Sequence, residues 1–541
     1  LSRLEMASRT PRTPRAKPHY IHTPPPPGLL EVENSGGSTS YAVDPRMPFE
    51  ERREAALEMM RSADEAAATL RAELCDRLSK SNAVSVYSTV VALERQSRRL
   101  PIAEVYGYDA VVEYLGGVVT SLPVESVHDG LRRTATAIEA LEIDSLLRDL
   151  ATAESQAGIA DLADDPDQRH VDARFLLLQE QQFDRMAGYN QHVRQIAHRI
   201  FEPLTELSIH TLGTSPVVVL DAAEAHARLQ ERLQTAALNE VVRNATLRQD
   251  TSPEQEFARQ SAGLLALGDA IRCDLRPTLE VTLGLEASEA NAVLNLLSTP
   301  LGTQNVKTLK SPNRLRRFPV IPLPDGTHIW ARPYDFLHDA LDWFDQVLID
   351  GNHERLRQRL SDERVRTVEG LTTEALGHVF GQARVHAAVE YQLPTGDWAE
   401  TDTLIDVVSS QIVVEAKGYR LTDPGRSGDA ARVRTKYKQL VTEPLVQSAR
   451  ARTALLGGTS LRDKRTQRPM PGRTPSSVSR CIVTLDRVDP FHAESRTQLS
   501  NNTTDQIDPK DVWIVCLADL LMVTAVLRSP AELFAYIETR A

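Results

Sequence analysis

The sequence contains little of what disulfide-bonded, zinc-binding and membrane proteins require. Its 541 residues include only four cysteines, at positions 75, 273, 481 and 516, and none has the CxxC spacing of zinc or redox sites. No run of 18 apolar residues is present to span a membrane. No secretory signal pattern opens the chain. We therefore expect a cytoplasmic protein without a membrane partner, a disulfide framework or a zinc site.

Several catalytic motifs are also missing. The sequence has no GxxxxGK[ST], which argues against a P-loop ATPase, and no HExxH, GxSxG or dinucleotide-binding glycine pattern. Its fourteen histidines show no metal-ligand spacing. Lysine is scarce as well, because only nine of the 62 basic residues are lysines. Arginine is the usual basic residue of this protein, so a lysine inside an apolar strand suggests that this position requires an ammonium group.

Three regions follow from length and composition, since 541 residues exceed what one core usually supports. Residues 1–46 are rich in proline, serine and glycine, which predicts a disordered tail. Residues 47–310 carry helical apolar periodicity, and the β-like run 216–220 is a candidate boundary between two helical subdomains near 211–221. This helical region is a candidate surface for a protein partner or for self-association. Residues 311–541 predict an α/β domain with a mixed central sheet.

A β-hairpin is predicted at the centre of the α/β domain. Residues 401–408 and 411–416 are rich in β-branched side chains, and Ser409-Ser410 separates them. A two-residue turn at these serines pairs Val408 with Gln411 and places Asp402 opposite Lys417. Asp402 and Glu415 then become diagonal neighbours roughly 7–8 Å apart. Two carboxylates at that separation can converge on one cation, with Lys417 beside them.

The hairpin residues Asp402, Glu415 and Lys417, with Glu415-Ala416-Lys417 as the (D/E)XK element, resemble the PD-(D/E)XK (restriction-endonuclease-like) nuclease superfamily. The resemblance covers residues 356–488, where the predicted order is helix, three strands, helix and strand. Thr401 stands where the proline of the family name would be. The resemblance implies a restriction-endonuclease-like fold in the C-terminal domain only.

The same resemblance implies a metal site and its chemistry. Mg²⁺, with Mn²⁺ as a substitute, would be held by Asp402, Glu415 and the Ala416 carbonyl, and Lys417 would orient the attacking water and stabilise negative charge. The family usually adds a glutamate from the preceding helix, for which Glu369 and Glu374 compete. The spacing of Glu369 to the following glycine and strand favours Glu369. Asp406 shares the strand face of Asp402 and is a candidate secondary ligand, and Glu400 is similar, but a partly exposed hairpin carboxylate is the favoured interpretation of both.

Charge distribution points to nucleic acid, although the net charge of −12 does not. Residues 418–480 carry fourteen basic and four acidic side chains, directly after the predicted site. The helix predicted over 429–456 offers candidate contacts to nucleic acid: Arg432, Arg434, Lys436, Lys438 and Gln439. For residues 458–480 alone, a solvated arginine-rich loop is the favoured interpretation.

These observations predict a Mg²⁺-dependent nuclease that hydrolyses phosphodiester bonds, with DNA as the expected substrate. Restriction, phage defence and repair are the settings that the family resemblance suggests. The alternative is a non-catalytic nucleic-acid-binding or assembly module that keeps a nuclease-like fold. The presence of Asp402, Glu415 and Lys417 together favours catalysis.

Overall fold

The structure is a computed structural model that describes residues 29–33, 39–43, 48–97, 108–162, 189–246, 252–308, 311, 313–333, 335–420, 435, 438–471, 473–487 and 512–540. The described chain divides into two compact units. Unit 1 contains the described residues before 163 and residues 221–336, and unit 2 contains 189–220 and 337–540. The boundaries therefore differ from the predicted division at 310/311.

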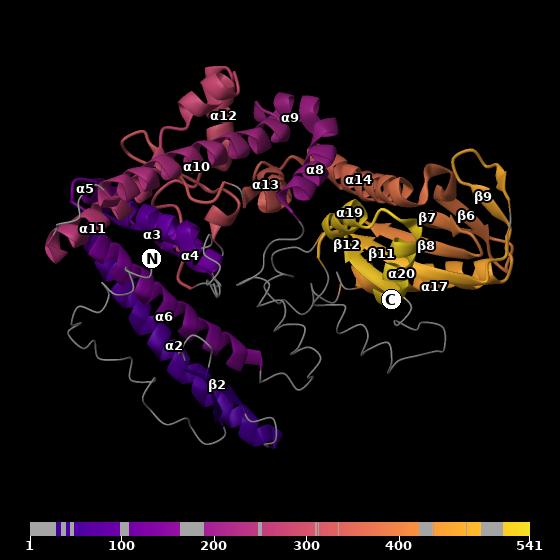
Figure 1. Cartoon of the computed structure of the whole chain (residues 1–541), viewed down its shortest axis with the longest axis horizontal. Helices are drawn as coiled ribbons and strands as arrows, with labels where there is room; N and C mark the ends of the chain where they lie inside the picture. Colours follow the sequence, from indigo (N-terminus) through magenta and orange to yellow (C-terminus); the bar gives the residue numbers. More distant parts are fainter. Residues whose placement is uncertain are drawn as a thin grey trace. The chain divides into compact units, whose positions relative to one another are not determined.

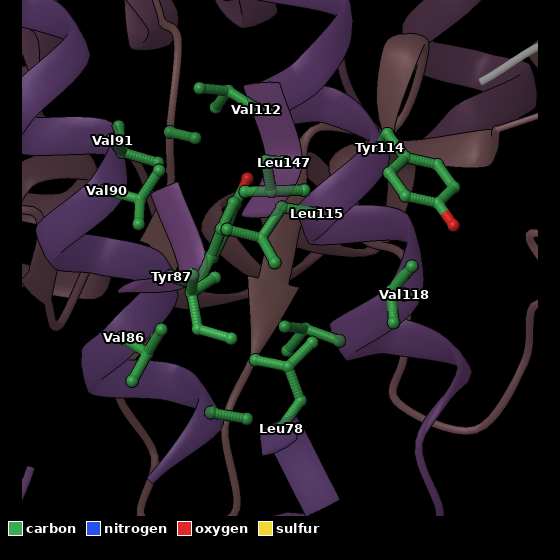
Figure 2. Packing of buried hydrophobic residues seen from close by; sticks show 14 of the residues in the cluster. Leu78, Val86, Tyr87, Val90, Val91, Val112, Tyr114, Leu115, Val118 and Leu147 are labelled. Atoms are coloured by element: carbon green, nitrogen blue, oxygen red, sulfur yellow. The ribbon is translucent and has the colours of Figure 1, made fainter. Parts of the chain in front are cut away.

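Unit 1 is helical, as predicted (Figure 1). Its helices are α2 (Phe49–Lys80), α3 (Ala83–Ser97), α4 (Tyr108–Ser121), α5 (Val124–Leu131), α6 (Ala137–Leu162), α10 (Pro216–Thr246, of which the first turn is assigned to unit 2), α11 (Pro253–Asp269) and α12 (Ala287–Leu297). The apolar stripes of α2, α3, α4 and α6 meet in one buried cluster, and Figure 2 shows Tyr87, Leu115 and Leu147 at its centre. Burial of such stripes, rather than helix propensity, stabilises these helices.

A small antiparallel sheet explains why residues 311–336 belong to unit 1. Its strand order is β3 (Arg272–Cys273), β5 (His328–Trp330) and β4 (Val320–Pro322). Ile321 and Ile329 from this sheet are buried in the same cluster as the helices. The hairpin of β4 and β5 turns at Pro324-Asp325-Gly326, and it completes the helical unit instead of opening the α/β domain.

The strand predicted near residues 216–220 is wrong, and part of the predicted disordered tail forms a pair of strands. The run Pro216–Leu220 is the first turn of α10 and not a strand, because the Ser215 hydroxyl accepts a hydrogen bond from Val217 N (3.2 Å) and proline is well tolerated in a first helical turn. In the predicted disordered tail, β1 (Leu29–Glu33) pairs antiparallel with β2 (Thr39–Val43). The rest of residues 1–46 lies outside the described residues.

Unit 2 contains a seven-stranded mixed sheet with helices, which confirms the predicted α/β class and the predicted mixed sheet. The strand order is β10-β9-β6-β7-β8-β11-β12, with β8, β11 and β12 parallel and the other neighbours antiparallel. The strands are β6 (Val385–Gln392), β7 (Trp398–Val407), β8 (Ser410–Lys417), β9 (Leu461–Asp463), β10 (Pro469–Met470), β11 (Ser477–Thr484) and β12 (Val512–Cys516). The helices are α8 (Asn190–Phe201), α9 (Thr205–Leu212), α13 (Phe336–Asp350), α14 (Glu354–Phe380), α17 (Glu443–Leu456), α19 (Leu517–Val526) and α20 (Pro530–Arg540). The predicted order of helix, three strands, helix and strand corresponds to α14, β6, β7, β8, α17 and β11.

Helices α14 and α17 cover opposite faces of the sheet, as Figure 1 also indicates. The Thr403 hydroxyl lies 2.9 Å from the Thr373 hydroxyl of α14. The next residue, Leu404, packs instead with Ala451 and Leu455 of α17. Successive residues of a strand point to opposite faces, so both faces of β7 are covered here. No helix in the described part of the chain is long and apolar enough to cross a membrane.

Candidate active site

The hairpin of β7 and β8 positions the predicted site, but the predicted register is wrong. Val407 pairs with Ser410 and Leu404 with Val413, so the two turn residues are Val408 and Ser409. Continuing this register places Asp402 across from Glu415 rather than Lys417. The two carboxylates are therefore direct neighbours across the strands instead of diagonal ones.

Apolar pairing accounts for this register. The observed alignment puts Leu404 opposite Val413 and lets the Gln411 side-chain amide donate to Asp406 Oδ1 (2.8 Å). The predicted alignment would have placed Leu404 opposite the Glu415 carboxylate. The observed turn requires Val408 to adopt a left-handed backbone (φ +50°), which is unfavourable for a β-branched residue. Burial of the apolar pairs outweighs that local strain.

The sheet opens at Asp402. The ladder between β7 and β8 ends at the pair Thr403–Val414, and the Asp402 carboxylate then accepts a hydrogen bond from Ala416 N (2.7 Å). On the neighbouring strand, Ala388 lies between the two residues that pair with Thr403 and Thr401, and it has a left-handed backbone (φ +51°). A carboxylate thus replaces a backbone ladder bond, which holds an acidic side chain between two strands at the point where they separate.

Three charged side chains meet at this opening. Lys417 Nζ lies 2.9 Å from Glu415 Oε2 and 3.2 Å from Asp402 Oδ2. The exposed fractions of the side chains are only 16% for Asp402, 2% for Glu415 and 15% for Lys417. The strands therefore bring together the three residues that the sequence singled out, in a site that is largely withdrawn from water.

Electrostatics at this site are unbalanced, because two carboxylates share one ammonium. Burial and the nearby Asp402 carboxylate raise the pKa of Glu415 well above its usual range. Burial alone would lower the pKa of Lys417, but the Glu415 and Asp402 carboxylates raise it, so the lysine is held protonated. A perturbed carboxylate beside a buried lysine is the kind of arrangement that is frequent at catalytic sites.

The structure distinguishes the two glutamates of the preceding helix. Burial and the Asp402 carboxylate raise the pKa of Glu369 to about 6, so Glu369 lies within the electrostatic field of the site. Glu374 is exposed and forms an ion pair with Arg199 at 2.9 Å. Of the two candidates, Glu369 is therefore the one that interacts with Asp402 and Lys417.

A close contact fixes the end of β8 against α14. A side-chain carbon at Gly418 would lie 2.8 Å from the backbone N and Cα atoms of Val365. Only glycine permits this approach, and it directly follows Lys417. Two residues later, the Arg420 side chain is only 8% exposed and pairs with Asp486 (2.8 Å) and with Asp342 of α13 (3.1 Å). Lys417 is therefore held between β8, which is hydrogen-bonded in the sheet, and residues 418–420, which these contacts fix in place.

The donor set fits a hard divalent cation. Within the described part of the chain, Glu415 Oε1 is buried and has no hydrogen-bond partner, so it has lone pairs available for a ligand. No group of three or more His, Cys, Asp or Glu side chains among the described residues is placed to hold a metal. Mg²⁺ usually binds through one or two carboxylates and keeps several waters, so a pair of carboxylates meets its requirement. Asp402, Glu415 and the Ala416 carbonyl are the groups that could hold it.

The predicted nucleic-acid contacts lie mostly outside the described residues. This applies to Arg432, Arg434 and Lys436. Lys438 is exposed, with its Nζ 3.9 Å from a Glu443 carboxylate oxygen, and Gln439 is half-buried; both lie in the short π-helix Lys438–Thr442 that precedes α17. The structure brings neither into the group formed by the site carboxylates and Lys417.

Two hairpin carboxylates take other partners. Asp406 lies 3.3 Å from His386 Nε2, and this contact and the Gln411 amide keep the pKa of Asp406 below its usual range. Glu400 pairs with Lys464 at 2.5 Å. Sequence reasoning missed Lys464, which follows β9 and interacts electrostatically with Glu369. The excess of basic residues over 418–480 was the available signal, but residues 458–480 were interpreted as a solvated loop.

No protein-family model, curated protein or solved structure matches this chain.

Proposed function

We propose that the protein is a metal-dependent nuclease that hydrolyses phosphodiester bonds in DNA and that unit 2 has a restriction-endonuclease-like fold. The observation that supports this proposal best is the buried group formed by Asp402, Glu415 and Lys417 at the opening between β7 and β8. Burying two carboxylates and an ammonium is unfavourable unless the site has a use for them. A metal-dependent phosphodiesterase uses both kinds of group.

Each side chain has a role in this proposal. Asp402 and Glu415, with the Ala416 carbonyl, would hold Mg²⁺ or Mn²⁺. The ion would supply a more acidic water and neutralise charge on the phosphate. The Lys417 ammonium would stabilise the negative charge that develops on the phosphate during attack. With a pKa near 6, Glu369 can accept or release a proton close to neutral pH.

Cleavage assays on the full chain test the proposal. Supercoiled plasmid, single-stranded DNA and RNA should be incubated with the protein in Mg²⁺, in Mn²⁺ and in EDTA. We expect metal-dependent cleavage of DNA by the wild type and none by Asp402→Asn or Glu415→Gln. Calorimetry should show weaker Mg²⁺ binding by both variants. Cleavage in EDTA, or unchanged Mg²⁺ affinity in both variants, would contradict the assigned roles.

One observation favours a second function, that of a non-catalytic nucleic-acid-binding or assembly module. Lys417 Nζ contacts both carboxylates, and such a closed ion group can stabilise a fold without binding metal. The cleavage assays described above, together with a measurement of DNA binding, distinguish the two functions. A protein that binds DNA tightly but never cleaves it in Mg²⁺ or Mn²⁺ is the non-catalytic module.

A further inference from the structure

Residues 461–470 form an ordered hairpin and not the solvated loop that their composition predicted. Strand β9 pairs with β10 at the edge of the seven-stranded sheet and with β6 on its other side. The segment contains four basic residues and a single acidic one: Arg462, Lys464, Arg465 and Arg468, with Asp463. We refer to residues 461–470 as the basic hairpin.

The turn of the basic hairpin is held by its own hydrogen bonds. Asp463 Oδ1 accepts from the backbone N (2.6 Å) and the hydroxyl (2.9 Å) of Thr466. Asp463 N donates to the carbonyl of Arg468 (2.9 Å), and Gln467 N donates to the carbonyl of Asp463 (2.8 Å). The Gln467 side chain donates to the carbonyl of Lys464 (2.7 Å). The turn is therefore ordered before any ligand arrives, which lowers the entropic cost of binding one.

The basic hairpin lies beside the candidate active site. Lys464 N donates to the carbonyl of Ala388 (3.0 Å), the residue next to the point where the sheet opens. The Lys464 ammonium pairs with Glu400, two residues before Asp402. Only β6 separates β9 from β7, so the hairpin lies about 10 Å from the strand that carries Asp402.

The basic residues of the hairpin fall into two groups. Arg462 pairs with Glu390 at 2.6 Å, and Lys464 is held by Glu400, so these two fasten the hairpin to the sheet. Arg465 and Arg468 are exposed and form no ion pair with any residue that the structure describes. Their guanidinium groups are therefore available to bind an external anion, and guanidinium pairs well with phosphate.

We propose that the basic hairpin binds the phosphate backbone of DNA and, through Arg465 and Arg468, holds the strand beside the site. This inference rests on the proposed nuclease function, since it names the substrate contact of that site. The charge, the ordered turn and the position near Asp402 support it together. The contacts are to phosphates, so they add affinity without reading sequence.

Binding measured without cleavage tests this role. Arg465→Gln/Arg468→Gln should be compared with Arg355→Gln/Arg528→Gln, which removes two exposed arginines of unit 2 elsewhere. Fluorescence anisotropy with a short labelled DNA duplex in EDTA gives affinity across a range of salt concentrations. We expect the hairpin variant to bind on the order of tenfold more weakly, with its salt slope reduced by about 2, because two fewer counterions are released. The control variant should keep the wild-type slope, and thermal unfolding should show that both variants are folded.

The outcomes separate this inference from the nuclease proposal. A hairpin variant with the wild-type slope, or with the same loss as the control, overturns the inference even if the wild type cleaves DNA. A reduced slope in a protein that never cleaves with Mg²⁺ or Mn²⁺ supports the hairpin and contradicts the nuclease. A wild type that binds no DNA overturns the role of the hairpin as well.

Discussion

Replacement of Lys417 by methionine should destabilise the metal-free protein, because Lys417 is the cation that both site carboxylates contact. The substitution keeps the length of the side chain and removes its charge, so no large cavity is created. Removing one partner of a buried ion pair costs about 3–5 kcal/mol. Lys417 is still 15% exposed, so we expect the lower end of that range, about 3 kcal/mol. For a unit of this size the loss corresponds to a decrease in melting temperature of about 6–12 °C.

The assay is thermal unfolding of the full chain in EDTA at pH 8, by calorimetry. Lys438→Met is the matched control, because Lys438 is an exposed lysine of the same unit that lies 3.9 Å from a Glu443 carboxylate oxygen. Pairs of this exposed kind contribute about 0–1 kcal/mol, so the control should melt close to the wild type.

Divalent cations should reverse much of the loss. Without the ammonium, Asp402 and Glu415 should bind Mg²⁺ or Mn²⁺ more tightly, and a ligand at 100 times its Kd stabilises by about 2.7 kcal/mol. The variant should therefore gain more from added Mg²⁺ than the wild type gains. Cleavage should still be lost, since the ion does not replace the charge that Lys417 supplies to the phosphate.

The loss should also depend on pH. With the ammonium gone, the pKa of Glu415 in the folded state rises further above its unfolded value, so the native state binds a proton that the unfolded state has released. Stability then falls as pH rises through this interval, and the deficit of the variant should be larger at pH 8 than at pH 5. A variant with the melting temperature of the wild type in EDTA at pH 8 would contradict the stabilising role of the Lys417 ammonium beside the two carboxylates. A variant that gains no more stability from Mg²⁺ than the wild type would contradict it as well.

Three further predictions follow from individual residues. Glu369→Gln should stabilise the metal-free protein by up to about 1 kcal/mol at pH 8 and not at pH 4.5, because the pKa of Glu369 is raised to about 6 and only the ionised form is unfavourable in this partly exposed position. Equal unfolding midpoints of the variant and the wild type at pH 8 would contradict this prediction. Val408→Asn should stabilise the protein by about 1 kcal/mol in urea unfolding, since asparagine tolerates the left-handed backbone of the turn. Val526→Asn is the control, because Val526 has the same 72% exposure, and it should not stabilise the protein. Gly418→Ala should destabilise the protein by about 2 kcal/mol and abolish cleavage, because the added carbon meets the backbone of Val365. A variant with the stability and turnover of the wild type would show that this contact is not tight.

Local periodicity in the sequence predicts which segments form helices and strands and which of their faces are buried. The helical periodicity of residues 47–310 and the strands on both sides of residues 408 and 409 predict elements that the structure contains, because the spacing of apolar residues reflects which face is buried. The trio Asp402, Glu415 and Lys417 was also selected from sequence, since charged residues in an otherwise apolar strand are unfavourable without partners. Pro216–Leu220 was misread because β-branched residues after a proline suit a strand and a first helical turn equally well.

Tertiary structure decided what depends on contacts between distant segments. The hairpin register follows from the burial of Leu404 against Val413 and α17, which no local turn rule could weigh against strain at Val408. The distinction between Glu369 and Glu374 required the packing of α14 on the sheet, because the two side chains are only five residues apart in sequence. Lys464 reaches the neighbourhood of the site only because β9 pairs with β6, a connection across more than 60 residues that composition cannot predict. Local pattern thus identified the charged residues, and strand pairing determined which of them share one electrostatic environment.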